Sequence, residues 1–115
     1  MYAQNEIIMR FAEVILLLAE VEYNRGNEAA ALDYVNEIRR RVQLEEKNSS
    51  GADLWDDIVK EKQLELALEG NRYFDLVRWG MGSEIPNFKP ATNGLWPIPI
   101  NALLTDSKLQ QNPGY

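Results

Sequence analysis

Hydrophobic and polar positions alternate with a helical period near the start of the chain. Over residues 6–24, placed at 100° per residue, the charged and amide side chains gather on one narrow side of the wheel. Apolar side chains spread over well more than half of the circumference, whereas a surface helix needs a stripe of only about 100°. The pattern predicts a helix over residues 6–24 that other parts of the protein cover on more than one side.

A second helical pattern over residues 28–42 follows after a very short link. Gly26 suits the left-handed position that ends a helix, and Asn27 is a favoured residue at a helix N-cap. A link this short predicts an antiparallel helical hairpin. Ala19, Gly26 and Ala31 have the spacing of the small residues of a tetratricopeptide repeat (TPR), so we expect a TPR-like hairpin.

Two further helices and an irregular end complete the predicted fold. A helix is expected over residues 54–69, with Asp53 as its cap, and a shorter one over residues 72–79. All five prolines follow residue 85, which disfavours helix, although Asn101 could cap one short helical turn. We predict a single all-α domain over residues 1–115, in which residues 80–115 form a proline-rich irregular wrap.

Composition excludes several kinds of function. The formal net charge of -6 disfavours nucleic-acid binding, which depends on basic surfaces. The chain has neither cysteine nor histidine, which removes thiolate chemistry and the commonest general base and transition-metal ligand. The longest apolar run is far shorter than the ~20 residues of a transmembrane helix, and the N-terminus lacks the pattern of an export signal. We expect no metal, no cofactor and no transmembrane segment.

Charged residues recur at helical spacing in the second half of the chain. Residues three or four positions apart lie near one another on a helix. The set consists of Glu65, Glu69, Arg72, Asp75 and Arg78, to which Arg10 and Glu13 add a pair on the first helix. One interpretation is an acid/base pair, as in glycoside hydrolysis. We favour a structural ion-pair network, because neighbouring arginines keep acids ionised while a general acid needs a raised pKa. No catalytic residue is therefore predicted.

Aromatic residues and the chain end provide two further candidates. Trp96 and Trp79 could stack on sugar rings, although packing in the core is the alternative for any large aromatic side chain. The closing residues Asn112, Pro113, Gly114 and Tyr115 form a turn signature. Chain ends fray unless they are tied down, so we interpret residues 112–115 as a structural latch without a ligand role.

Four segments, taken in order, form a recognisable pattern: residues 10–20, residues 31–39 with Arg41, residues 65–80, and residues 95–99 followed by 109–115. This pattern resembles the SusD/RagB family of outer-membrane nutrient-binding lipoproteins. The last two segments are the specific ones, and one departure is Asp106-Ser107, where the family usually has Asn-Pro. The resemblance covers nearly the whole chain but only the C-terminal part of a full family member, so we expect a fragment or a truncated relative.

The resemblance implies a function for the parent protein. It would bind nutrients, mainly glycans, as a lipoprotein on the bacterial outer-membrane surface, together with a SusC-like TonB-dependent transporter and without catalysis or a cofactor. This chain itself carries no export signal, and no ligand-binding residue of the family transfers to a numbered position here. The alternative is a TPR-like scaffold for protein–protein interaction that binds no sugar.

Overall fold

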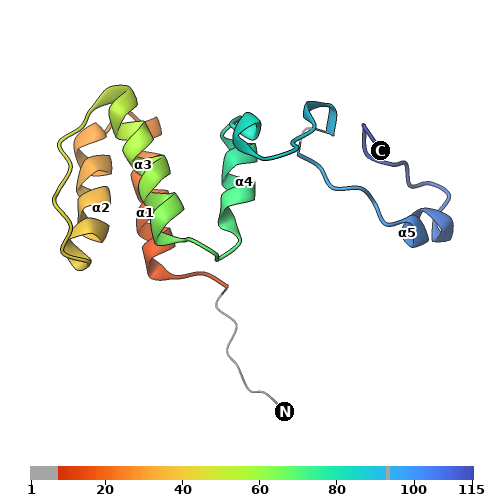
Figure 1. Cartoon of the computed structure of the whole chain (residues 1–115), viewed down its shortest axis with the longest axis horizontal. Coiled ribbons are helices and arrows are strands. Elements are labelled where there is room, and N and C mark those ends of the chain that lie inside the picture. The colour runs from red at the N-terminus through yellow and green to blue at the C-terminus, as the bar shows by residue number, and fades with distance from the viewer. Residues whose placement is uncertain (1–7, 93) are drawn as a thin grey trace, which may run out of the picture. The chain divides into compact units, whose positions relative to one another are not determined.

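The computed structural model describes residues 8–92 and 94–115, which are helical or irregular and include no strand. They belong to two compact units, Met1–Glu69 and Gly70–Tyr115, here called the N-terminal and C-terminal units (Figure 1). Within the described ranges, no helix combines the length and apolar character that crossing a bilayer requires. The predicted all-α fold is confirmed, and the single domain over residues 1–115 stays a prediction.

The N-terminal unit consists of three helices, α1 (Phe11–Asn24), α2 (Glu28–Arg41) and α3 (Gly51–Glu65). α1 and α2 form the predicted TPR-like hairpin, and Gly26 takes the left-handed conformation in the turn between them, with φ of 83°. The side chain of Asn27 donates to Glu22 rather than capping α2. Ala19 and Ala31 are fully buried with Leu54 of α3, so small residues allow the close approach of the helices that their spacing predicted.

The first helix begins later than predicted. Residues 6 and 7 lie outside the described residues, residues 8–10 are not helical, and α1 begins at Phe11. Arg10 lies at the N-cap with an extended backbone, and its guanidinium is bound to Glu65 and Glu69. The helical spacing of side chains continues through residues 8–10, but a local pattern does not reveal this contact with a distant part of the chain.

The third helix spans residues 51–65 instead of the predicted 54–69. At its start, Ser50 rather than Asp53 is the N-cap, and the N–H of Gly51 donates to Glu28 Oε2 at 3.0 Å. At its end, Arg10 Nη2 donates to the carbonyl of Glu65 at 2.7 Å. That carbonyl would accept from the N–H of residue 69 in a continuing helix. The N–H of Glu69 instead donates to the carbonyl of residue 66 at 3.2 Å, and the helix ends.

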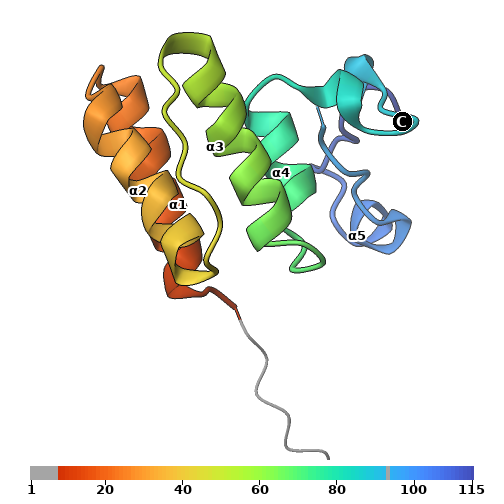
Figure 2. The same cartoon turned by 60° about the vertical axis from the view of Figure 1, so that its left-hand side comes forward.

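The connector between α2 and α3, residues 42–50, runs as an extended chain beside the helices (Figure 2). The side chain of Asn36 on α2 makes two hydrogen bonds to the backbone of Lys47, at 2.7 and 3.0 Å. Arg39 Nε donates to the carbonyl of Glu45 at 2.7 Å, and the Lys47 ammonium pairs with Asp57 of α3 at 2.8 Å. Side chains of both helices therefore hold a segment that has no regular structure of its own.

The C-terminal unit begins with α4 (Asn71–Arg78), within one residue of the predicted helix over residues 72–79. Two 3₁₀ turns, η1 (Gly82–Glu84) and η2 (Pro90–Thr92), and the short helix α5 (Ile100–Thr105) interrupt the proline-rich wrap. The predicted helical turn near Asn101 corresponds to α5, although Pro99 rather than Asn101 lies at its N-cap. The hydroxyl of Tyr73 on α4 donates to the carbonyl of Gly94 at 2.9 Å, which ties the wrap to the helix.

The closing residues contact the extended strip formed by residues 95–99. The Gln111 side chain accepts from the N–H of Ile98 at 2.8 Å and donates to its carbonyl at 3.0 Å. Asn112 Nδ2 donates to the carbonyl of Trp96 at 2.6 Å, and the Tyr115 hydroxyl donates to that of Leu95 at 3.0 Å. Four side-chain hydrogen bonds thus join the chain end to the strip.

Candidate functional site

An aromatic cluster, formed by Tyr73, Phe74 and Trp96, lies on the surface of the C-terminal unit. The ring centroids of Tyr73 and Trp96 are 5.5 Å apart, and those of Tyr73 and Phe74 are 5.6 Å apart in an edge-to-face arrangement. Trp96 is 65% exposed and Phe74 is 64% exposed, although aromatic rings are usually buried. The cluster therefore presents apolar rings to solvent.

Hydrogen bonds on two sides hold Trp96 in place. The Tyr73 hydroxyl binds the backbone of Gly94, and Asn112 binds the carbonyl of Trp96 itself. Trp79, the other tryptophan singled out from the sequence, is half-buried, and the guanidinium of Arg78 lies 4.9 Å from its ring centroid. Of the two candidates, Trp96 is thus the one that offers an accessible ring.

The closing residues Asn112, Pro113, Gly114 and Tyr115 lie against η2 as well as against the strip. Gly114 has φ of 89°, and a Cβ atom there would lie 2.9 Å from Cγ2 of Thr92. Glycine is thus required both by the backbone conformation and by the close approach of the two segments. Residues 112–115 make the contacts that a latch needs, while their importance for stability stays a prediction.

An ion-pair cluster in the N-terminal unit contains three of the predicted network residues together with Arg41. Arg10 donates to the Glu69 carboxylate through Nε and Nη2 at 2.7–3.0 Å, and to Glu65 Oε1 through Nη1 at 2.8 Å. Arg41 pairs with the same oxygen of Glu65. Burial acts to raise the pKa of Glu65, but the hydrogen bonds from Arg10 and Arg41 outweigh it, and the pKa lies below its ordinary value. This carboxyl is therefore poorly suited to act as a general acid.

The remaining predicted charges lie elsewhere. In the C-terminal unit, Arg78 pairs with Asp75 at 2.9 Å, and Arg72 pairs with Glu84 at 3.1 Å. Glu84 was not among the residues picked from the sequence, because η1 brings it back toward α4 only in the folded chain. Glu13 makes no ion pair within the described part of the chain, since the Arg10 guanidinium is directed to Glu65 and Glu69. A single network joining all these residues stays a prediction.

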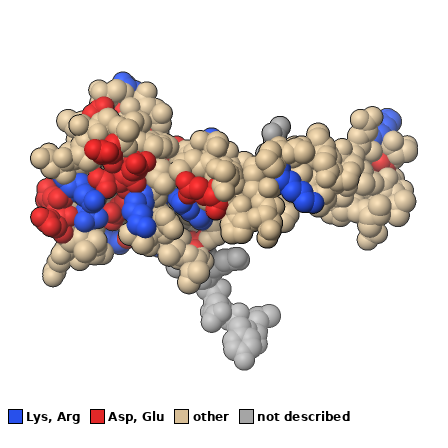
Figure 3. Space-filling model, turned by 45° about the horizontal axis from the view of Figure 1, so that its top comes forward, with Lys and Arg blue, Asp and Glu red and all other residues tan. Residues whose placement is uncertain are grey.

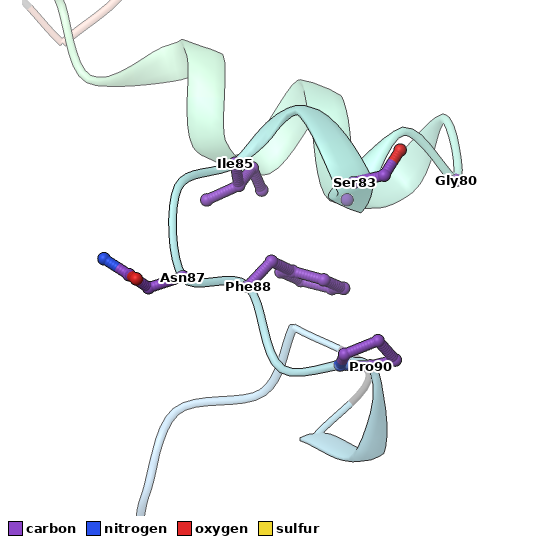
Figure 4. A pocket seen from close by; sticks show the side chains of 7 residues that line it. Gly80, Ser83, Ile85, Asn87, Phe88 and Pro90 are labelled. Carbon is purple, nitrogen blue, oxygen red and sulfur yellow. The ribbon is translucent and has the colours of Figure 1, made fainter.

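The described residues of the C-terminal unit line two hollows that the sequence did not indicate. The larger, about 480 Å³, is lined by Gly80, Gly82, Ser83, Ile85, Asn87, Phe88 and Pro90. Figure 4 shows the Asn87 side chain pointing away from the Phe88 ring. The smaller, about 170 Å³, is lined by Tyr73, Ile85, Pro86, Asn87, Phe88, Lys89, Thr92 and Tyr115. Its walls come from segments up to 42 positions apart, which no local pattern could reveal.

We searched the described residues for side chains that could bind a metal ion. Among residues 8–92 and 94–115, no group of three or more His, Cys, Asp or Glu side chains is arranged to hold a metal ion. The acidic side chains that lie close together, Glu65 and Glu69, are both bound to Arg10.

Known proteins resemble the chain in sequence and in structure. Residues 1–94 match the profile of the SusD family. The chain is 36% identical to SusD-like protein P2 of Formosa agariphila, over 96% of this chain and 26% of that protein. It is 30% identical to the starch-binding protein SusD of Bacteroides thetaiotaomicron, over 99% of this chain and 22% of that protein.

The fold agrees with the sequence comparisons. The crystal structure of a SusD-like protein from Bacteroides fragilis superposes with a TM-score of 0.86 at 31% identity, covering 96% of this chain and 26% of that one. The chain therefore spans about a quarter of the length of the relatives it matches. The profile match, the sequence relatives and the shared fold together establish that this chain belongs to the SusD family.

Proposed function

We propose that the chain is one part of a longer SusD-like protein that captures glycans at the bacterial outer-membrane surface. A relative that matches 99% of this chain is named as a starch-binding protein, which supports a polysaccharide as the ligand. The relatives are about four times as long as the chain, which supports its being part of a larger protein. Delivery would be to a SusC-like TonB-dependent transporter, as the family resemblance implies.

The observation that carries the proposal within this chain is the exposed aromatic cluster. The C–H faces of pyranose sugars are flat and apolar, and an accessible tryptophan ring matches them in shape and polarity. Trp96 has most of its surface exposed, and its backbone is held by Asn112, so the ring needs little ordering before it binds. Trp96 would stack on a sugar ring, with Tyr73 and Phe74 extending the apolar surface.

The test is a calorimetric titration of the wild-type chain and of Trp96→Ala with soluble starch, pectin and xylan. We expect the wild type to bind at least one of the three, and Trp96→Ala to bind it roughly tenfold more weakly, which corresponds to ~1.4 kcal/mol. Trp79→Phe is the matched control, because its ring already lies beneath Arg78. A Trp96→Ala variant that binds as well as the wild type would remove Trp96 from the proposal.

The transporter partnership needs a separate test. A tagged protein that contains this sequence would be purified from outer membranes of its host, and the proteins that accompany it would be identified. A TonB-dependent transporter is the expected partner. Recovery of a soluble protein alone would argue against the partnership.

Binding without catalysis agrees with the charges in the N-terminal unit. Two arginines surround the Glu65 carboxylate and keep its pKa low, which disfavours proton donation to a glycosidic oxygen. Hydrolysis of a bound polysaccharide by the purified chain, detected as reducing ends, would contradict this part of the proposal.

The second candidate is a scaffold that binds another helix, and one observation favours it. Phe11, Val14, Leu18 and Val21 follow the alternating spacing of three and four residues that is typical of a helix–helix seam. Phe11 is 75% exposed, and Leu18 and Val21 are also exposed. Tyr23 and Tyr34, in contrast, pack against the buried core. In the longer protein the same seam would be covered by another part of the chain.

A further inference from the structure

The smaller hollow of the C-terminal unit, here called the Lys89 hollow, is built from segments that are fixed by hydrogen bonds. The N–H and the hydroxyl of Thr92 both donate to the carbonyl of Lys89, at 3.0 and 2.8 Å, which sets the turn that carries Lys89. The opposite wall is Tyr115, whose hydroxyl is bound to Leu95. Gly114 permits the chain end to approach Thr92, so the two walls stay close together.

Aromatic rings and polar side chains line this hollow together. Tyr73, Phe88 and Tyr115 line it together with Pro86. Tyr73 is also the central ring of the aromatic cluster, since it contacts both Phe74 and Trp96. The hollow therefore adjoins the surface on which Trp96 would stack a sugar, and it can take a neighbouring ring of the same glycan.

Two polar side chains of the hollow, Lys89 and Asn87, have donor groups that no side chain or backbone acceptor among the described residues occupies. The Lys89 ammonium has no carboxylate partner among the described residues, and its neighbour is the Tyr115 ring, whose centroid is 5.9 Å away. The described arginines of the unit, Arg72 and Arg78, are in contrast paired with acids. The Asn87 carboxamide makes no hydrogen bond within the described part of the chain, and no Asp or Glu lines the hollow.

The surroundings do not neutralise this charge. Residues 70–115 carry four Lys or Arg and three Asp or Glu, whereas the chain as a whole has a net charge of -6. Figure 3 shows acidic and basic side chains crowded over the N-terminal helices, while the C-terminal unit is largely uncharged on the face shown. A lysine in such a setting attracts an anion with little competition from nearby acids.

We propose that the Lys89 hollow binds the carboxylate-bearing ring of an acidic sugar, a uronic acid unit of a glycan. Lys89 and Asn87 would donate to the carboxylate, and the rings of Tyr115 and Tyr73 would contact the C–H face of the sugar. The volume of about 170 Å³ equals that of about six liquid waters, at ~30 Å³ each, which suits one ring and no more. The inference rests on the proposed glycan-binding function and makes its ligand class specific.

The test compares three small probes by chemical-shift titration of the whole chain: methyl β-D-glucuronide, methyl β-D-glucoside and acetate. We expect the glucuronide to bind at least tenfold more tightly than either of the others, with the largest shifts at Asn87, Lys89 and Tyr115. Lys89→Gln should abolish the preference for the glucuronide over the glucoside. Lys108→Gln is the matched control and should retain it, because Lys108 is another exposed lysine of the unit but lies outside the hollow.

Asn87→Gly provides a second variant, since glycine retains the left-handed backbone of Asn87, with φ of 61°, and removes only the amide. It should weaken glucuronide binding several-fold. Equal binding of glucuronide and glucoside, a preference that survives Lys89→Gln, or acetate binding as tight as that of the glucuronide would overturn the inference. If glycan binding that depends on Trp96 persists in any of these cases, the proposed function stands while the acidic-sugar site does not.

Discussion

Arg10 provides the sharpest test of what holds the N-terminal unit together, through the substitution Arg10→Lys. Its planar guanidinium makes hydrogen bonds to two carboxylates and to the carbonyl that ends α3, and its side chain is only 27% exposed. A lysine keeps the charge but cannot reproduce this fork of donors. Each hydrogen bond to a charged group contributes ~1.5–3 kcal/mol, but Lys retains one contact and Glu65 retains Arg41. We therefore expect a loss of ~2 kcal/mol.

The assay is urea unfolding followed by circular dichroism at pH 7. A loss of ~2 kcal/mol lowers the folding equilibrium constant about 30-fold and the Tm by roughly 8 °C. Arg25→Lys is the control, because Arg25 is 67% exposed and makes one pair with Glu22, and it should change stability by less than ~0.5 kcal/mol. If Arg10→Lys is as stable as Arg25→Lys, the geometry of the guanidinium does not matter and the reasoning is wrong.

The difference in stability between wild type and Arg10→Lys should depend on pH in a predictable way. Because folding lowers the pKa of Glu65 from its ordinary 4.5, the folded state binds its proton less readily than the unfolded state does. Its contribution to stability is then complete above pH 4.5 and is lost as the pH falls through the folded pKa. The difference between wild type and Arg10→Lys should therefore be constant near neutral pH and shrink in acid. A difference that grows as the pH falls would contradict this sign.

Two further substitutions test the two units separately. Leu16→Ala removes a fully buried side chain and should cost ~3 kcal/mol in urea unfolding, whereas Leu64→Ala, at a 57% exposed position, should cost less than ~0.5 kcal/mol. Gly114→Ala forces a side chain into a left-handed backbone and against Thr92, so it should loosen the chain end by ~1–2 kcal/mol and speed amide exchange at Ile98. Gly26→Ala has the same backbone strain in open space and in the other unit, so it should leave exchange at Ile98 unchanged.

The fold class could be predicted from the sequence because periodicity and turn residues act locally. Ala19, Gly26 and Ala31 lie within one hairpin, where spacing alone indicates which residues meet. The ends of the helices could not be predicted with equal success. Arg10 both delays the start of α1 and captures the last carbonyl of α3, and no pattern near residue 65 announces an arginine 55 positions away.

The candidate site depends even more on contacts between distant residues. Tyr73 and Trp96 meet because a hydroxyl on α4 binds the carbonyl of Gly94, and two glycines with positive φ, Gly94 and Gly114, permit the close approaches. The sequence identified Trp96 as a candidate by its type and proline-rich setting. It gave no indication of the Lys89 hollow, because nothing local shows that Lys89 lacks an acidic partner.

The contact between Gln111 and Ile98 also limits how this protein can associate with itself. Pro97 and Pro99 have no backbone N–H, so the N–H of Ile98 is the only donor that residues 97–99 could offer to a neighbouring strand. Gln111 occupies both that donor and the carbonyl beside it, as a paired strand would. The two prolines already weaken the segment beside exposed Trp96 and Leu95 as an edge for strand pairing, and the contact with Gln111 removes the donor that they leave. The amide of Gln111 thus occupies the backbone groups of Ile98 that would otherwise be open to a strand of another molecule.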